Sequence, residues 1–126
     1  MDALLSEARE LVLQYGEYVR GKDLDAIMRS LCEDAHFEIL HRPLIEGKEA
    51  IQHFYEENFA LGSYSFEFQF TDEKNVSDVI FINGLMEKIE TPQGQPSETI
   101  KFIFSFILKK EDGVLKIWQC RVTRPE

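Results

Sequence analysis

The sequence predicts an α+β fold in which three helices in the first half of the chain pack on a curved, mostly antiparallel sheet. The first observation is that the period of apolar residues changes from helical spacing to two after residue 62. The second is the segment 64–70, YSFEFQF, in which aromatic residues alternate strictly with Ser, Glu and Gln. The third is Asp112–Gly113 between two apolar runs, which is typical of a tight hairpin turn.

Three segments have the periodicity of amphipathic helices. In residues 4–19 the apolar side chains recur at i, i+3, i+4 and i+7, and Gly21 ends this first helix. Asp23 is a suitable N-cap for a second helix, whose apolar stripe is Leu24, Ile27, Met28 and Leu31. Residues 48–59, KEAIQHFYEENF, form the third helix, with one apolar side made by Ile51, Phe54 and Tyr55.

Strands are predicted between the second and third helices and throughout the second half. The stretch DAHFEILH, residues 34–41, has the pattern of a strand that ends at His41 before a turn containing Pro43. A candidate bulge lies at Asn83–Gly84. The strands of the second half are residues 64–70, 76–91, 99–110 and 114–123.

The strand at residues 99–110 is apolar on both faces. On one face apolar residues alternate from Ile100 to Leu108, while Ile103 and Ile107 flank Ser105 on the other. Such a strand is typical of a sheet that is covered on both sides. Because the helices can cover only one face, we expect the outer face of the sheet to form a homodimer; a buried loop is the alternative.

Composition and charge limit the classes of protein. The 126 residues correspond to a single domain, residues 1–126. The net charge of −9 argues against nucleic acid and anionic membranes as partners, because both require a basic patch. The two cysteines form no C-x-x-C pair, and the acidic N-terminal segment does not resemble a signal peptide. We therefore expect a soluble cytoplasmic protein.

Two segments and the last hairpin resemble a known superfamily. QYGEYVRGKDLDAIMRSLCEDAHFEI and IEGKEAIQHFY are similar to the opening segments of nuclear transport factor 2-like proteins, in the SnoaL-like and ketosteroid isomerase-like branch. KKEDGVLKIWQ resembles their closing hairpin, although Leu115 stands at the usual place of the tryptophan, which comes later as Trp118. The resemblance implies a sheet that wraps a helix and leaves a cone-shaped cavity. It leaves the function open, because the superfamily contains isomerases, dehydratases, cyclases, epoxide hydrolases and non-catalytic modules.

The resemblance also implies candidate catalytic residues. Tyr15 takes the position of the tyrosine that stabilises an oxyanion in the ketosteroid isomerases. Ile39 takes the position of their carboxylate base and the second acid falls near Ser105, so steroid isomerisation by that route is not expected. Strand alternation places His41 on the face of Phe37 and Ile39, where it could serve as general base or acid. The alternatives are that Tyr15 fills the core and that His41 caps the strand.

The implied cavity has an apolar lining. The candidate ligand-binding residues are Phe37, Ile39, Phe54, Phe66, Phe102 and Trp118. Such a lining with few polar groups is typical of sites for small apolar or aromatic molecules. Arg42 and Arg121 are placed where either could hold an anionic substituent at the cavity mouth. No phosphate loop or metal-ligand spacing occurs, so we expect neither a cofactor nor a metal.

Two functions fit the sequence. The first is a small-molecule-binding domain that acts as a cofactor-independent isomerase, dehydratase or cyclase, with Tyr15 and His41 transferring protons. The second is a non-catalytic dimeric module that binds a ligand or another protein. The missing carboxylates favour the second function, and so do the ten phenylalanines, because their rings could fill the cavity.

Overall fold

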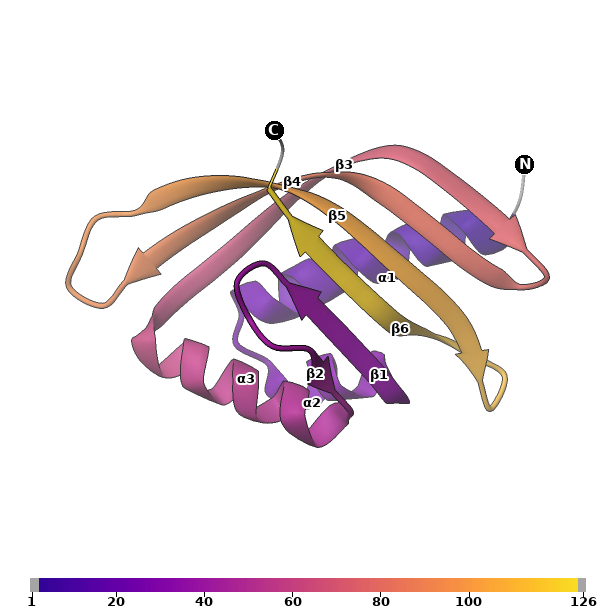
Figure 1. Ribbon diagram of the computed structural model, residues 1–126, viewed down its shortest axis with the longest axis horizontal. Coiled ribbons are helices and arrows are strands. Elements are labelled where there is room, and N and C mark those ends of the chain that lie inside the picture. The colour runs from indigo at the N-terminus through magenta and orange to yellow at the C-terminus, as the bar shows by residue number, and fades with distance from the viewer. Residues whose placement is uncertain (1–2, 125–126) are drawn as a thin grey trace.

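One six-stranded sheet carries three helices on its concave side (Figure 1). The structure is a computed structural model that describes residues 3–124. The helices are α1 (Ala3–Arg20), α2 (Leu24–Arg29) and α3 (Lys48–Leu61). The strands are β1 (Leu31–Ile39), β2 (Ile45–Glu46), β3 (Gly62–Val76), β4 (Val79–Pro92), β5 (Glu98–Glu111) and β6 (Val114–Thr123). The predicted α+β fold, with three helices on a curved and mostly antiparallel sheet, is confirmed.

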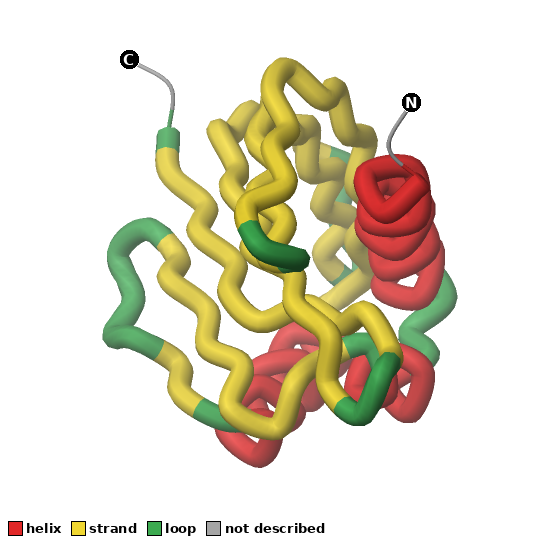
Figure 2. The backbone as a smooth tube through the Cα atoms, turned by 90° about the vertical axis from the view of Figure 1, so that its right-hand side faces the viewer, coloured by secondary structure: helices red, strands yellow, loops and turns green. Residues whose placement is uncertain are grey.

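The sheet is antiparallel except at one pair of strands. Its order is β2-β1-β6-β5-β4-β3, and β1 runs parallel to β6. The long strands β3, β4 and β5 bend, so that the sheet arches over the helices (Figure 1). Figure 2 shows α1 alongside this arch and the two shorter helices together below it. Within residues 3–124 the helices therefore cover the concave face of the sheet and leave its convex face without a second layer.

Small side chains let α1 pack closely on the sheet. Ala8, Val12, Gly16 and Val19 are buried along one side of the helix. A Cβ atom at Gly16 would lie only 2.8 Å from the ring of Phe68, so the absence of a side chain there permits the contact. Neither α1 nor any other helix of the described chain is long and apolar enough to cross a membrane.

The second helix is shorter than predicted. Asp23 caps it as expected, because its carboxylate accepts a hydrogen bond from the Ala26 amide at 3.2 Å. The prediction that Leu31 belongs to the helical stripe is wrong, since Leu31 begins β1. The amide of Ile117 in β6 donates a hydrogen bond to the Ser30 carbonyl at 2.8 Å. This bond joins the chain to the last strand directly after the helix, so the helix cannot continue.

The strand β1 ends two residues earlier than predicted. Its last residue is Ile39, and His41 lies in the following turn with a positive φ of 65°. The Arg42 amide donates a hydrogen bond to the Ile39 carbonyl at 3.1 Å and closes this turn. The argument from strand alternation therefore does not apply to His41, whose direction is set by the turn.

A bulge occurs at the predicted place, but its extra residue belongs to β3 and not to β4. Asn83 and Gly84 are consecutive residues of β4, and they face three residues of β3, of which Thr71 is the extra one. Gly84 is required in this position because a Cβ atom there would lie 2.1 Å from the Gln69 carbonyl oxygen. The bulge increases the local bend of the long strands.

A second bulge, in β6, was not predicted. Ile117 and Gln119 pair with consecutive residues of β5, which leaves Trp118 without a partner in the ladder. Trp118 and Gln119 consequently both lie toward the convex side, where the Lys109 ammonium is 4.1 Å from the centre of the Trp118 ring. After the bulge, Cys120 returns to the buried side of the sheet.

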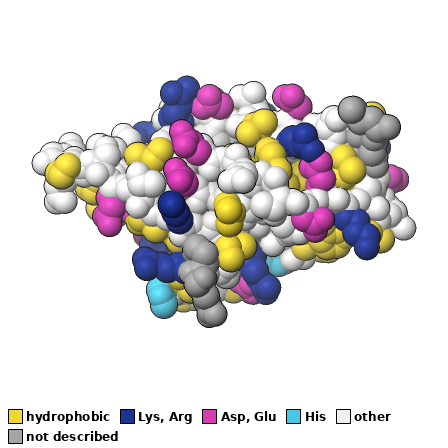
Figure 3. Space-filling model, turned by 90° about the horizontal axis from the view of Figure 1, so that it is seen from above, with side chains coloured by type: hydrophobic (Ala, Val, Ile, Leu, Met, Phe, Trp, Pro, Cys, Tyr) yellow, Lys and Arg dark blue, Asp and Glu magenta, His cyan; other side chains and the backbone are white. Residues whose placement is uncertain are grey.

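The convex face of the sheet presents apolar side chains among charged ones (Figure 3). Phe81, Leu85 and Ile103, from β4 and β5, are 37%, 44% and 39% exposed. Between them Ser105 Oγ donates a hydrogen bond to Asn83 Oδ1 at 2.6 Å. The central strand is therefore apolar on both faces, as the sequence indicates.

Candidate functional site

A cavity of about 310 Å³ lies between the concave face of the sheet and the helices α1 and α3. This volume is in the range of sites for small organic molecules. Aromatic rings form much of the wall, contributed by Tyr15, Phe37, Phe54, Tyr55, Phe66 and Phe102. The phenylalanine rings therefore line the cavity implied by the resemblance rather than filling it.

Tyr15 projects from α1 into the wall of this cavity. Its ring is only 3% exposed and packs edge-on against Phe106, with the ring centres 5.8 Å apart. The hydroxyl of Tyr15 has no hydrogen-bond partner among the described residues. In the described chain, every side-chain oxygen without a partner can be reached by solvent, and this includes the Tyr15 hydroxyl. The hydroxyl of Tyr15 is therefore open to the cavity, where a ligand atom can accept its hydrogen bond.

Tyr55 is a second tyrosine in the same wall, and the sequence did not single it out as functional. It lies on α3, is 5% exposed, and its ring centre is 6.5 Å from that of Tyr15. Its hydroxyl likewise has no partner among the described residues. Burial raises the pKa of Tyr55 well above its ordinary value, so the hydroxyl stays a hydrogen-bond donor. A hydroxyl on the apolar side of the predicted helix was the available signal.

His41 lies at the rim of the cavity. It is exposed, it belongs to the turn after β1, and it is among the residues that line the cavity. A histidine in this position can contact both solvent and a molecule bound in the cavity. Among the described lining residues, His41 is the one imidazole.

Charged and polar groups surround the outer part of the cavity. The Lys88 ammonium lies 2.8 Å from a Glu90 carboxylate oxygen and 4.8 Å from the centre of the Tyr64 ring. Burial raises the pKa of Tyr64, and the negative charge of Glu90 raises it further, while Arg42 opposes the shift. The Tyr64 hydroxyl donates a long hydrogen bond of 3.4 Å to Asn58 Oδ1. These groups make the outer part polar, in contrast to the inner wall.

The structure brings most of the predicted site residues together. Around one cavity lie Tyr15, Phe37, Ile39, His41, Phe54, Phe66 and Phe102. Trp118 is not part of this lining, because the bulge in β6 turns it to the convex side. Arg121 also lies away from the cavity mouth, since its guanidinium pairs with Glu38 on the convex face.

The positions of the two isomerase carboxylates hold other residues here. Ile39 lines the cavity, as the resemblance implies, but cannot accept a proton. Ser105 faces the convex side, while its neighbours Phe104 and Phe106 face the concave side. Glu90 is the only acidic residue in the described lining, and it is paired with Lys88.

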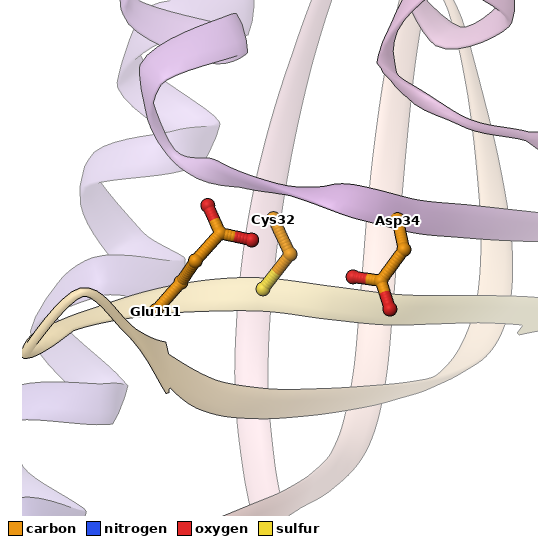
Figure 4. A group of neighbouring side chains, drawn as sticks. All are labelled: Cys32, Asp34 and Glu111. Carbon is orange, nitrogen blue, oxygen red and sulfur yellow. The ribbon is translucent and has the colours of Figure 1, made fainter.

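A separate group of potential metal ligands lies at the edge of the sheet (Figure 4). One ligand atom from each of Cys32, Asp34 and Glu111 lies within 4.8 Å of the others. Lys109 pairs with Asp34 at 3.2 Å, and Lys116 pairs with Glu111 at 3.4 Å. Burial, aided by the charge of Glu111, raises the pKa of the Cys32 thiol to about 11. Two ammonium groups and a protonated thiol make this an ion-pair cluster rather than a cation site.

Comparison with known sequences gives no match: no protein-family model matches the chain, and no curated protein sequence does. Solved structures give clear matches. A ketosteroid isomerase-like protein from Erwinia carotovora atroseptica superposes with a TM-score of 0.87 at 16% identity, covering 100% of this chain and 99% of the other. A scytalone dehydratase-like protein from Novosphingobium aromaticivorans gives 0.86 at 12% identity, covering 94% and 82%. An NTF2-like protein from Pseudomonas putida gives 0.80 at 17% identity, covering 98% and 87%.

These similarities establish the fold. The chain has the nuclear transport factor 2-like fold, shared with ketosteroid isomerase-like and scytalone dehydratase-like proteins. The resemblance found in the sequence is thereby confirmed at the level of the fold. Because one fold can carry many activities, the function has to be argued from the cavity itself.

Proposed function

We propose that the chain binds a small, largely apolar carbonyl or phenol compound in its cavity and catalyses a cofactor-independent isomerisation, dehydration or cyclisation by proton transfer. The observation that carries the proposal is the pair of tyrosine hydroxyls, Tyr15 and Tyr55, that face an aromatic cavity without a protein partner. A hydroxyl that opens to the cavity and has no protein partner can donate its hydrogen bond to a ligand oxygen.

Tyr15 and Tyr55 are suited to stabilising negative charge on a ligand oxygen. Both are neutral donors in a wall of low polarity, where a hydrogen bond to a developing oxyanion is stronger than in water. The raised pKa of Tyr55 keeps its proton in place across the neutral range. The centres of the two rings lie 6.5 Å apart in the same wall, so a ligand in the cavity lies beside both tyrosines.

His41 is the group proposed to move the proton. Its imidazole takes a proton from a carbon next to the ligand carbonyl, the C–H electron pair forms the enolate, and the enolate oxygen accepts a hydrogen bond from Tyr15. The imidazolium then returns a proton to the same carbon or to another one. No electrons leave the ligand, so the reaction requires no oxidant or reductant.

Hydrogen–deuterium exchange on a simple ketone tests this chemistry without knowledge of the natural substrate. In D₂O the wild-type protein should accelerate deuterium incorporation next to the carbonyl of 1-tetralone, followed by NMR. Tyr15→Phe should slow the exchange by roughly 10²- to 10³-fold and His41→Gln by roughly 10²- to 10⁴-fold.

Two matched variants serve as controls for this experiment. Tyr18→Phe removes a hydroxyl from the same helix, and His53→Gln removes an exposed imidazole from α3; neither residue lines the cavity. Both variants should exchange as fast as the wild type. Binding of 1-tetralone without accelerated exchange would contradict the catalytic part and favour a non-catalytic ligand-binding module.

A homodimer through the convex face of the sheet is the second part of the proposal. Phe81, Leu85 and Ile103 give this face an apolar centre, and a hollow of about 290 Å³ lies beside them. Sedimentation at micromolar concentration should show a dimer that Leu85→Lys converts to a monomer. Leu13→Lys, on the exposed side of α1, should leave the dimer intact. A monomeric wild type would overturn this part alone.

A further inference from the structure

The rim of the cavity carries more positive than negative charge, although the protein as a whole is acidic. Arg42, Lys88 and Arg124 belong to the lining, against a single acidic residue, Glu90. The net charge of the chain is −9. The local excess of positive charge is therefore the opposite of what the composition alone would give.

Pairing leaves two of these cations available. Lys88 is 2.8 Å from Glu90, which neutralises both side chains. Within residues 3–124, neither Arg42 nor Arg124 has an acidic partner within ion-pair distance. Both residues are exposed at the rim, whereas the tyrosine hydroxyls of the inner wall belong to buried side chains.

The surroundings hold Arg42 in place. Its guanidinium carbon lies 4.9 Å from the centre of the Phe54 ring, and Phe54 itself lines the cavity. A guanidinium over an aromatic face keeps its edge free, and that edge offers parallel N–H donors that match a carboxylate. The Arg42 backbone is fixed by its hydrogen bond to the Ile39 carbonyl at 3.1 Å. The geometry thus directs a cation over the wall that an apolar ligand would contact.

We propose that the ligand of this cavity is an amphiphilic anion: an aromatic or alicyclic body with a carboxylate that binds at the rim between Arg42 and Arg124. This inference rests on the proposed function and names its substrate class. The apolar body of the ligand lies against the aromatic wall of the cavity, and an oxygen of the ligand accepts a hydrogen bond from Tyr15 or Tyr55. The carboxylate of the ligand stays at the rim. An acidic protein repels anions in general, so a preference for a carboxylate requires a local site.

Two fluorescent probes of equal size separate charge from shape. 6-Hydroxy-2-naphthoate carries a carboxylate at one end and a hydroxyl at the other, and 6-hydroxy-2-naphthamide replaces the carboxylate with a neutral group. The wild-type protein should bind the carboxylate roughly five- to twentyfold more tightly than the amide. Added salt should reduce this preference, because the rim is exposed to solvent.

Single arginine variants show which residues produce the preference for the carboxylate over the amide. Arg42→Gln should lower the affinity for the carboxylate toward that for the amide and leave the affinity for the amide nearly unchanged, which also shows that the variant is folded. Arg124→Gln should give a smaller loss of the same kind. Arg121→Gln removes the same charge from the convex face, where the guanidinium pairs with Glu38, and should change neither affinity.

The outcomes separate this inference from the function on which it rests. Equal affinity for the two probes, or equal loss in Arg42→Gln and Arg121→Gln, overturns the carboxylate site and leaves the apolar cavity intact as a ligand site. Failure of both probes to bind contradicts the proposed function, and the inference fails with it. Loss of both affinities in Arg42→Gln would show that Arg42 acts through packing on Phe54 and would also overturn the inference.

Discussion

The space between α1 and the sheet is filled at one end and hollow at the other, although aromatic rings line both. At the filled end, the rings of Phe68 and Phe104 meet edge-on with their centres 5.4 Å apart, and Phe70 lies 6.0 Å from Phe104. At the hollow end, the ring centres of Tyr15 and Phe66 are 6.5 Å apart, and both rings border the cavity. The number of aromatic residues therefore does not determine whether the interior is packed.

The elements that face the sheet differ between the two ends. Ala8, Val12 and Gly16 bring α1 close to the sheet, so the rings of β3 and β5 reach the helix and fill the space. Farther along, Tyr15 and Val19 of α1 share the opposing wall with α3 and the turn after β1, and no described side chain occupies the centre. A tight helix contact and a ligand cavity thus use one sheet surface, and the elements that face each end of it differ.

The largest expected effect compares two phenylalanines of β5 that lie two residues apart. Phe104→Ala should lower the free energy of unfolding by about 3–5 kcal/mol, because Phe104 is fully buried in the filled end. Phe102→Ala should cost only about 1–2 kcal/mol, because its half-buried ring borders a cavity that exists already. Urea denaturation measures both. Equal losses would mean that the two ends are packed alike.

A smaller effect concerns the thiols. Burial raises the pKa of Cys32 from 9.0 to about 11 and that of Cys120, which lines the hollow end, still further. At about pH 8 Cys32 should react with iodoacetamide roughly 100-fold more slowly than a free thiol, and Cys120 more slowly still; both should react faster as the pH rises.

The same shifts affect stability at high pH. A raised pKa means that the folded state favours the protonated thiol. The contribution of the Cys32 thiol to the free energy of unfolding is therefore complete below about pH 9 and is lost as the pH rises toward 11.

In the labelling experiment with iodoacetamide, mass spectrometry of the labelled protein distinguishes the two cysteines. Rapid labelling of Cys120 near pH 8 would show that the hollow end is wet and open to reagents.

The smallest expected effect is that of Tyr15→Phe on stability. The hydroxyl of Tyr15 has no partner in the described protein, so its removal should change the free energy of unfolding by less than about 0.5 kcal/mol. Thermal or urea unfolding of the variant beside Tyr64→Phe, which loses a bond to Asn58, makes the measurement. A loss of about 1–3 kcal/mol would reveal a structural partner for Tyr15 and count against its role in the cavity.

Local patterns were sufficient to predict the layers of the fold and much of the cavity wall. Helical spacing identified α1, and strict alternation identified which residues of β3 face inward, among them Phe66. Trp118 was misplaced because a bulge depends on the register between two strands, which neither strand reveals alone. His41 lies at the rim, but through a turn with positive φ rather than through the alternation that placed it there.

The parallel pairing of β1 with β6 also affects the order in which the strands of the sheet can assemble. Glu38 and Arg121 form an ion pair across this junction although 83 positions separate them in the sequence. The strand β1 therefore has its parallel neighbour far along the sequence, and the cavity wall that Cys120 and Val122 supply is absent until β6 has docked. Such distant pairing slows folding, so an early intermediate with β3, β4 and β5 paired would expose its aromatic rings until the last strand docks.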